Sequence, residues 1–142
     1  MTGHRFAAVL FDLDGTVWDS ASGILDSLAH ALRAVGESPG DPAVHAQQIG
    51  PALRLMLADA GVPDDRLDEG VAAYRERYRT HGEFDCVLYE GMGALLAELQ
   101  LAGLRLATAT SKSVEPARRM VEHHGVRHFF DYIMKMTTAN SH

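Results

Sequence analysis

Two carboxylates, Asp12 and Asp14, lie one residue apart at the end of a short apolar run, residues 7–11. The run is too short to span a membrane and has the length of a buried strand. Side chains at positions i and i+2 of a strand point to the same face, so the two carboxylates would crowd each other and attract a cation. Gly15 then lets the backbone turn sharply, and Thr16 adds a hydroxyl. A plain Asp-rich turn after a strand is the alternative interpretation.

A second polar group follows another apolar run, residues 104–109, and comprises Thr110, Ser111, Lys112 and Ser113. Ligands of open α/β sheets bind at the carboxyl ends of the strands. If the two apolar strands are neighbours, the carboxylates face the Thr110 and Ser111 hydroxyls, and a helix that begins near Ser113 directs free N–H groups to the same place. One group favours a cation and the other an anion, so a phosphate ester with Mg²⁺ would suit both. Simple helix capping is the alternative for residues 110–113.

The elements that must position these groups follow the order strand, helical block, helix, strand, helix, strand, which predicts an α/β fold with a parallel sheet. Far more residues separate Asp12 from Thr110 than the dozen or more that a helical crossover needs. Residues 18–86 account for the surplus and carry four predicted helices, each with an apolar stripe. We interpret this block as an α-helical insert folded over the sheet.

Composition narrows the class of protein. The 142 residues are 46% hydrophobic and carry 13 basic against 19 acidic side chains, a net charge of −6. Such a balance argues against a nucleic-acid surface, which needs a basic stripe, but allows a small phosphorylated metabolite as a partner. Cys86 is the single cysteine and cannot form an internal disulfide. With no signal peptide visible, we expect a cytoplasmic protein that binds neither membrane nor nucleic acid.

The residues Asp12-Leu13-Asp14-Gly15-Thr16-Val17, followed by Asp19-Ser20, resemble the first motif of the haloacid dehalogenase-like (HAD) hydrolases. Nearly the whole chain resembles the phosphoglycolate phosphatase branch, through residues 12–20, 49–54, 89–91, 104–112 and 128–131. The resemblance implies a parallel Rossmann-like core of residues 1–17 and 87–142, into which residues 18–86 are inserted as an α-helical cap.

The resemblance also implies roles for single residues. Asp12 would be the nucleophile that forms an aspartyl-phosphate, and Asp14 the general acid and then the base. Asp12 and the backbone carbonyl of Asp14 would bind Mg²⁺, while Thr110 and the neighbouring Ser111 hold phosphate oxygens. The implied activity is Mg²⁺-dependent hydrolysis of a small, phosphoglycolate-like phosphate monoester. Asp14 argues against a dehalogenase, because a halide leaving group needs no acid.

The sequence departs from the family pattern after the second polar group. The third motif is a Lys usually followed by Pro, and the fourth is a Gly-Asp with further acidic residues. The chain reaches His142 before either, and Lys135 is not followed by Pro. We therefore expect a fragment or frame-shifted product with the last strands of the core missing. The strand of residues 7–11 would then be an edge open to self-association.

Two other functions stay open at this point. A sugar-phosphate mutase of the same family would return the phosphoryl group to its substrate. An inactive truncated fragment, or an interaction module made from one, would use the fold without the chemistry.

Three further residues carry weaker signals. Arg54, in the insert, would contact a substrate carboxylate or simply be solvated. Trp18 would cover the site or fill the joint between cap and core. The His123-His124 pair precedes Gly125, and we interpret it as a cationic cap at a helix C-terminus rather than a metal pair.

Overall fold

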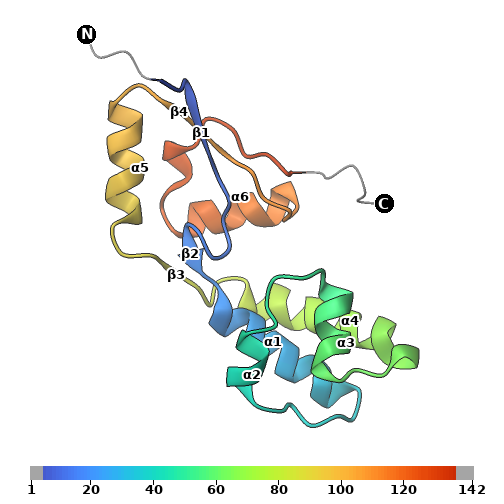
Figure 1. Cartoon of the computed structure of the whole chain (residues 1–142). Coiled ribbons are helices and arrows are strands. Elements are labelled where there is room, and N and C mark those ends of the chain that lie inside the picture. The colour runs from blue at the N-terminus through green and yellow to red at the C-terminus, as the bar shows by residue number, and fades with distance from the viewer. Residues whose placement is uncertain (1–4, 137–142) are drawn as a thin grey trace. The chain divides into compact units, whose positions relative to one another are not determined.

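The computed structural model describes residues 5–136 and divides them into two compact units (Figure 1). The sheet unit runs to Asp19 and resumes at Val87, and the helical unit comprises Ser20–Cys86. The sequence-based boundary at residue 18 differs because Trp18–Asp19 (β2) pairs antiparallel with Val87–Leu88 (β3). This two-residue ribbon keeps Trp18 with the sheet unit. No helix within residues 5–136 has the length and apolar character that crossing a membrane requires.

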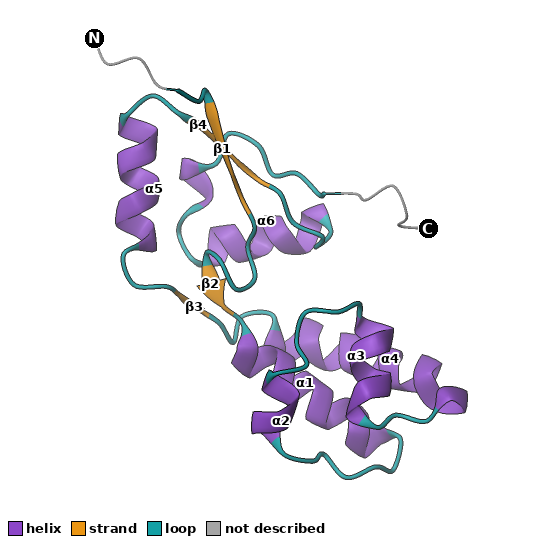
Figure 2. Cartoon of the chain, viewed as in Figure 1, coloured by secondary structure: helices purple, strands orange, loops and turns teal. Residues whose placement is uncertain are grey.

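The sheet unit is built on two parallel strands (Figure 2). Ala8–Phe11 (β1) pairs with Arg105–Thr108 (β4), and the register sets Phe11 opposite Thr108. Met92–Leu101 (α5) precedes β4, and Val114–His123 (α6) follows it. The predicted α/β fold with a parallel sheet is confirmed, with the strands of residues 7–11 and 104–109 as direct neighbours.

Residues 132–136 correspond to the last strand of the expected order. They lie beside β4 but make only isolated parallel bridges there. Tyr132 bridges Ala107, and Lys135 bridges Thr110. Between these points the Thr108 hydroxyl accepts a hydrogen bond from the Met134 amide at 2.8 Å and donates to the Met134 carbonyl at 3.0 Å. A side chain therefore takes the place of main-chain partners, which interrupts the regular ladder.

The core of the sheet unit is built around β4 and α6 rather than around β1, where Phe11 alone is buried. Leu13, Trp18, Leu106 and Met120 are fully buried. Phe11 is buried against Phe130 in an edge-to-face contact with ring centroids 6.2 Å apart. Leu10, by contrast, is 59% exposed, so the expectation of a buried strand is wrong at this position. Among residues 5–136, β1 pairs with β4 alone, and its second edge has no strand beside it.

The helical unit contains the four helices that the sequence predicts. They are Ala21–Ala34 (α1), Pro42–Ala46 (α2), Leu53–Ala60 (α3) and Leu67–Arg77 (α4), with a 3₁₀ turn at Asp64–Arg66 (η1). Asp41 caps α2 by accepting a hydrogen bond from the Ala43 amide. The apolar faces meet in one cluster, whose fully buried members include Leu28, Leu32 and Leu57.

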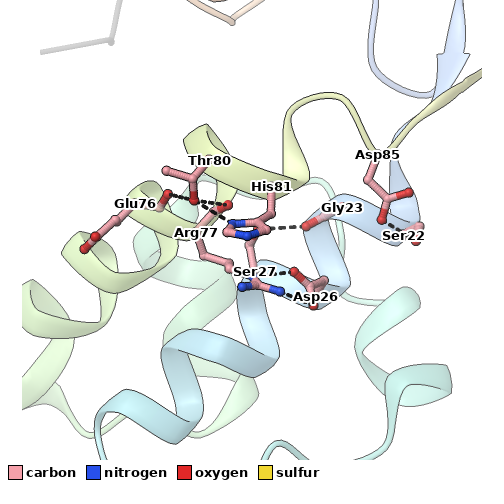
Figure 3. A network of polar contacts seen from close by, with 9 residues as sticks. All are labelled: Ser22, Gly23, Asp26, Ser27, Glu76, Arg77, Thr80, His81 and Asp85. Carbon is pink, nitrogen blue, oxygen red and sulfur yellow. Dashed lines mark hydrogen bonds and ion pairs between the residues drawn. The ribbon is translucent and has the colours of Figure 1, made fainter.

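The two ends of the helical unit meet where α1 begins and where a π-helical turn, Tyr78–Gly82 (η2), ends (Figure 3). A Cβ atom on Gly23 would lie 2.2 Å from the Gly82 carbonyl oxygen, so this backbone contact requires glycine. Ser22 donates a hydrogen bond to Asp85 at 2.8 Å. These contacts join the entry and exit of the unit.

An ion pair lies close to the same junction (Figure 3). Arg77 donates from Nε to Asp26 at 2.8 Å, and this hydrogen bond lowers the pKa of Asp26 below its ordinary value. The positive charge of Arg77 adds to that effect, and His81 and His30 contribute less. Both partners are partly exposed, so the pair orients α4 on α1 more than it stabilises the unit.

Candidate active site

The two polar groups predicted from the sequence follow the carboxyl ends of β1 and β4. The Ala109 amide donates to the Phe11 carbonyl at 2.7 Å, so the ladder continues to the last residue before Asp12. Asp12 follows β1, and Thr110 follows β4, so both residues lie at the carboxyl end of the parallel pair. The expected neighbouring position of the two strands is therefore observed, and the two loops begin side by side.

Asp12 owes its position to the buried residue that follows it. Leu13 is fully buried, and its amide donates to Asp12 Oδ1 at 2.8 Å. Its carbonyl accepts hydrogen bonds from the Thr16 and Val17 amides, which close the turn that Gly15 allows at φ 77°. With Leu13 fixed inward, Asp12 is exposed at the strand end, where a nucleophile can meet a ligand.

Asp14 is the residue that connects the two loops. Its Oδ1 accepts a hydrogen bond from Trp18 Nε1 at 2.9 Å, and its Oδ2 pairs with Lys112 Nζ at 3.3 Å. The Lys112 side chain is 13% exposed and that of Asp14 33% exposed. Sequence reasoning missed both partners of Asp14, although each lies in a loop that it singled out. Lys112 was the available signal, as a cation in a loop predicted to face two carboxylates.

The loop after β4 contains one buried and one exposed hydroxyl. Thr110 is buried, and its Oγ1 accepts from the Lys112 amide at 3.1 Å, which leaves the hydroxyl proton free to donate. Ser111 is exposed. Ser113 is the N-cap of α6 but makes no side-chain capping bond. The first amides of α6 thus keep the polarity that attracts an anion.

Trp18 lies beneath this site, fully buried within the sheet unit. Its ring stacks on His124 with centroids 4.8 Å apart and planes inclined by 27°. Burial, with a smaller contribution from His123, lowers the pKa of His124. The interpretation of the His123-His124 pair as a cationic cap is therefore wrong for His124, whose half-buried ring packs against an aromatic face and favours the neutral form.

Arg54 lies in the other unit, on α3, where it pairs with Asp68 at 2.6 Å. Both side chains are well exposed, at 56% and 94%. A surface pair of this kind contributes little to stability and breaks readily, so it leaves the guanidinium available to a ligand.

Within residues 5–136, the candidate metal ligands are the Asp12 carboxylate and the backbone carbonyl of Asp14. That part of the chain contains no cluster of three or more His, Cys, Asp or Glu side chains suited to a metal ion. Mg²⁺ in proteins commonly uses one or two carboxylates and completes its shell with water and phosphate oxygens. The exposed Asp12 carboxylate fits that pattern. Both Asp14 carboxylate oxygens already face donors, so Asp14 fits through its backbone carbonyl.

Comparison with known proteins identifies the family of the chain. The model of the haloacid dehalogenase-like hydrolases matches residues 9–142, from β1 onward. The chain belongs to the haloacid dehalogenase-like hydrolase family. The family resemblance expected from the first motif is thereby confirmed, together with its α/β fold.

Three relatives illustrate the range of this hydrolase family. The tyrosine-protein kinase PtkA of Mycobacterium tuberculosis is 42% identical over 98% of this chain and 47% of its own length. A phosphoglycolate phosphatase of Rhodospirillum rubrum is 34% identical over 81% of this chain and 52% of its own. The structure of a haloacid dehalogenase-like hydrolase from Streptococcus pneumoniae superposes with a TM-score of 0.86 at 30% identity, covering 96% of this chain and 64% of that one. The chain thus spans about half the length of the curated relatives it matches.

Proposed function

We propose that this protein is a Mg²⁺-dependent phosphatase that hydrolyses a small, phosphoglycolate-like phosphate monoester through an aspartyl-phosphate on Asp12. One observation carries the proposal: the Asp14–Lys112 ion pair, at 3.3 Å, joins the carboxylate loop after β1 to the hydroxyl loop after β4. A nucleophile, a second carboxylate, a cation and hydroxyl donors then share one edge of the sheet. The similarity to a phosphoglycolate phosphatase supports the same class of substrate.

The first step forms a bond between an Asp12 carboxylate oxygen and the phosphorus atom and breaks the bond to the leaving oxygen. Asp14 donates a proton to that oxygen as it departs. Thr110, with its free hydroxyl proton, and the first amides of α6 hold the phosphoryl oxygens. The positive charge of Lys112 stabilises the negative charge on the transferring phosphoryl group.

In the second step, water attacks the phosphorus atom of the aspartyl-phosphate, and Asp14 takes the proton that the water loses. The bond to Asp12 breaks and inorganic phosphate leaves, so that Asp12 is again a carboxylate and Asp14 again the protonated acid that the first step requires. Each Asp14 oxygen has two lone-pair directions, so each can face Trp18 or Lys112 and still exchange a proton with the substrate.

Asp12 and the backbone carbonyl of Asp14 would hold Mg²⁺, whose charge offsets that of the transferring phosphoryl group. We further propose that the helical unit acts as a cap that excludes water from the reaction, and that Arg54 on α3 meets the substrate carboxylate. Loss of the exposed Asp68 pair would cost little when Arg54 changes partner.

The test is hydrolysis of an aryl phosphate with and without Mg²⁺ by the wild-type chain and by Asp12→Asn. Asp12→Asn should reduce turnover by about three orders of magnitude or more, because the amide is no nucleophile. Since Asp12 is exposed, the variant should keep the wild-type circular dichroism spectrum and melting temperature. Wild-type turnover in the variant would overturn the assignment of the nucleophile.

The 42% identity to a protein named as a tyrosine kinase favours a second candidate function, phosphoryl transfer to a tyrosine hydroxyl. A separate assay with labelled ATP and a protein acceptor tests the transferase, which would place the label on tyrosine. The aryl phosphate assay tests the phosphatase, which would release inorganic phosphate.

A further inference from the structure

We propose that Trp18 is a positioning residue, whose indole N–H orients the Asp14 carboxylate for proton transfer. The inference rests on the proposed function, since it concerns the acid and base of that reaction. Trp18 Nε1 donates to Asp14 Oδ1 at 2.9 Å, while Lys112 approaches the other oxygen at 3.3 Å. Two donors on opposite oxygens define the plane of the carboxylate.

Trp18 is held more firmly than the residue it binds. It is fully buried, and its backbone pairs with Leu88 in the β2–β3 ribbon. Its carbonyl accepts from the Gly15 amide at 2.9 Å, which closes the turn that carries Asp14. The His124 ring covers one face of the indole. The N–H direction is therefore fixed by the packing of the whole ring.

Asp14 itself lacks such packing. It is one-third exposed and precedes Gly15, the most permissive residue of the turn. A carboxylate in that setting rotates among several orientations unless a donor selects one. Proton transfer requires the acid to lie within hydrogen-bond reach of the departing oxygen, so a rotated Asp14 would slow the chemical step and leave substrate binding unchanged.

A role in packing alone would make a different prediction, and two variants separate the cases. Trp18→Phe keeps an aromatic ring against His124 but removes the N–H. Because Trp18 is the chain's single tryptophan, growth with 3-benzothienylalanine replaces the N–H by sulfur at this position alone and preserves the bicyclic shape. Both variants therefore lose the hydrogen bond to Asp14, but only Trp18→Phe also loses side-chain volume.

Kinetics on two phosphate esters give the expected signature. With an alkyl phosphate, whose leaving oxygen is strongly basic, kcat should fall by about tenfold or more in both variants while KM stays within about twofold. With p-nitrophenyl phosphate, whose leaving group needs no proton, the rate of the first-turnover burst of p-nitrophenol should fall by less than about threefold, because formation of the aspartyl-phosphate then needs no acid. Equal losses on both esters, or a loss in Trp18→Phe alone, would overturn the inference.

A measurement without substrate keeps this inference separate from the proposed function. The indole N–H gives one signal in a ¹⁵N-correlated spectrum, and it should exchange slowly with solvent in the wild type. Asp14→Ala should shift that signal and accelerate its exchange at least tenfold, whereas Asp85→Ala, in the helical unit, should leave it unchanged. A wild-type chain without phosphatase activity would refute the proposed function, and an indole signal indifferent to Asp14→Ala would refute the role of Trp18.

Discussion

At the scale of single residues, the polar side chains that follow β1 and β4 differ in exposure and in their partners. Asp12 is exposed, Asp14 is shared between Trp18 and Lys112, and a histidine of lowered pKa packs below Trp18. A protonated His124 would lose hydration through burial, and the neighbouring His123 further lowers the pKa of His124. The imidazole ring packed against the tryptophan therefore favours its neutral form.

A pH dependence of stability follows from His124. Its pKa lies below the ordinary value of about 6.5 in the folded chain, so the unfolded chain binds the proton more tightly. Its contribution to stability is complete above about pH 6.5 and decreases as the pH falls toward the folded-state pKa. The melting temperature should fall between pH 7.5 and pH 5.5, and His124→Gln should reduce that fall. His128→Gln, at an exposed position, is the matched control, and an unchanged fall in His124→Gln would contradict the argument.

At this scale the sequence predicted which candidate residues follow the ends of neighbouring strands, but not the contacts that organise them. Asp12, Asp14 and Thr110 were identified because strand ends and polar residue types are local features. The Trp18–Asp14 hydrogen bond depends on a turn closed by Leu13, and the Trp18–His124 stack on the packing of α6 under β2. Such contacts arise from tertiary structure, which periodicity does not reveal.

At the scale of elements, the close backbone contact between Gly23 and Gly82 determines the structure at the base of the helical unit more than helix propensity does. Helices α1 to α4 could be predicted because caps and apolar spacing mark them. The β2–β3 ribbon could not, since two-residue strands have no periodicity to detect. The π-helical turn at η2 was also missed, because it follows from how the chain packs where Gly82 approaches Gly23.

Two Gly→Ala variants test that contact. In Gly23→Ala the new methyl would lie 2.2 Å from the Gly82 carbonyl oxygen, so α1 and η2 must separate. We expect a loss of about 1–3 kcal/mol in the free energy of unfolding, the usual cost of overpacking. Gly93→Ala on α5 meets no atom within 4 Å and should be neutral or stabilise by up to about 1 kcal/mol. Urea denaturation measures the free energy of unfolding of both variants. Equal changes in that free energy would show that the Gly23–Gly82 contact tolerates a methyl group.

At the scale of the whole molecule, the open edge of β1 is the feature with the widest consequences. No strand covers that edge within residues 5–136. Phe6, which precedes β1, is 68% exposed, and Leu10, within β1, is 59% exposed. An apolar strand with unpaired N–H and C=O groups pairs readily with a like strand. A second copy of the chain carries the same open strand with the same apolar side chains.

We therefore expect the 142-residue chain to self-associate through β1 in a concentration-dependent manner. Leu10→Lys should shift sedimentation toward the monomer, because a charged side chain on an edge strand disfavours pairing. Leu101→Lys, at an 87% exposed position on α5, is the control and should sediment as the wild type. A wild-type chain that is monomeric across the concentration range would contradict the prediction.

The contact between Gly23 and Gly82 also bears on how this protein could be recombined. Since the helical unit enters and leaves at one junction, and β2 pairs with β3 just outside it, residues 20–86 form a cassette whose two ends are adjacent. Domain insertion succeeds most readily where the termini of the inserted piece are close together. A different module with similarly spaced ends could replace this one without rethreading the sheet. If the helical unit acts as the proposed cap, such a graft would change substrate preference while Asp12, Asp14 and Lys112 stay in the sheet unit.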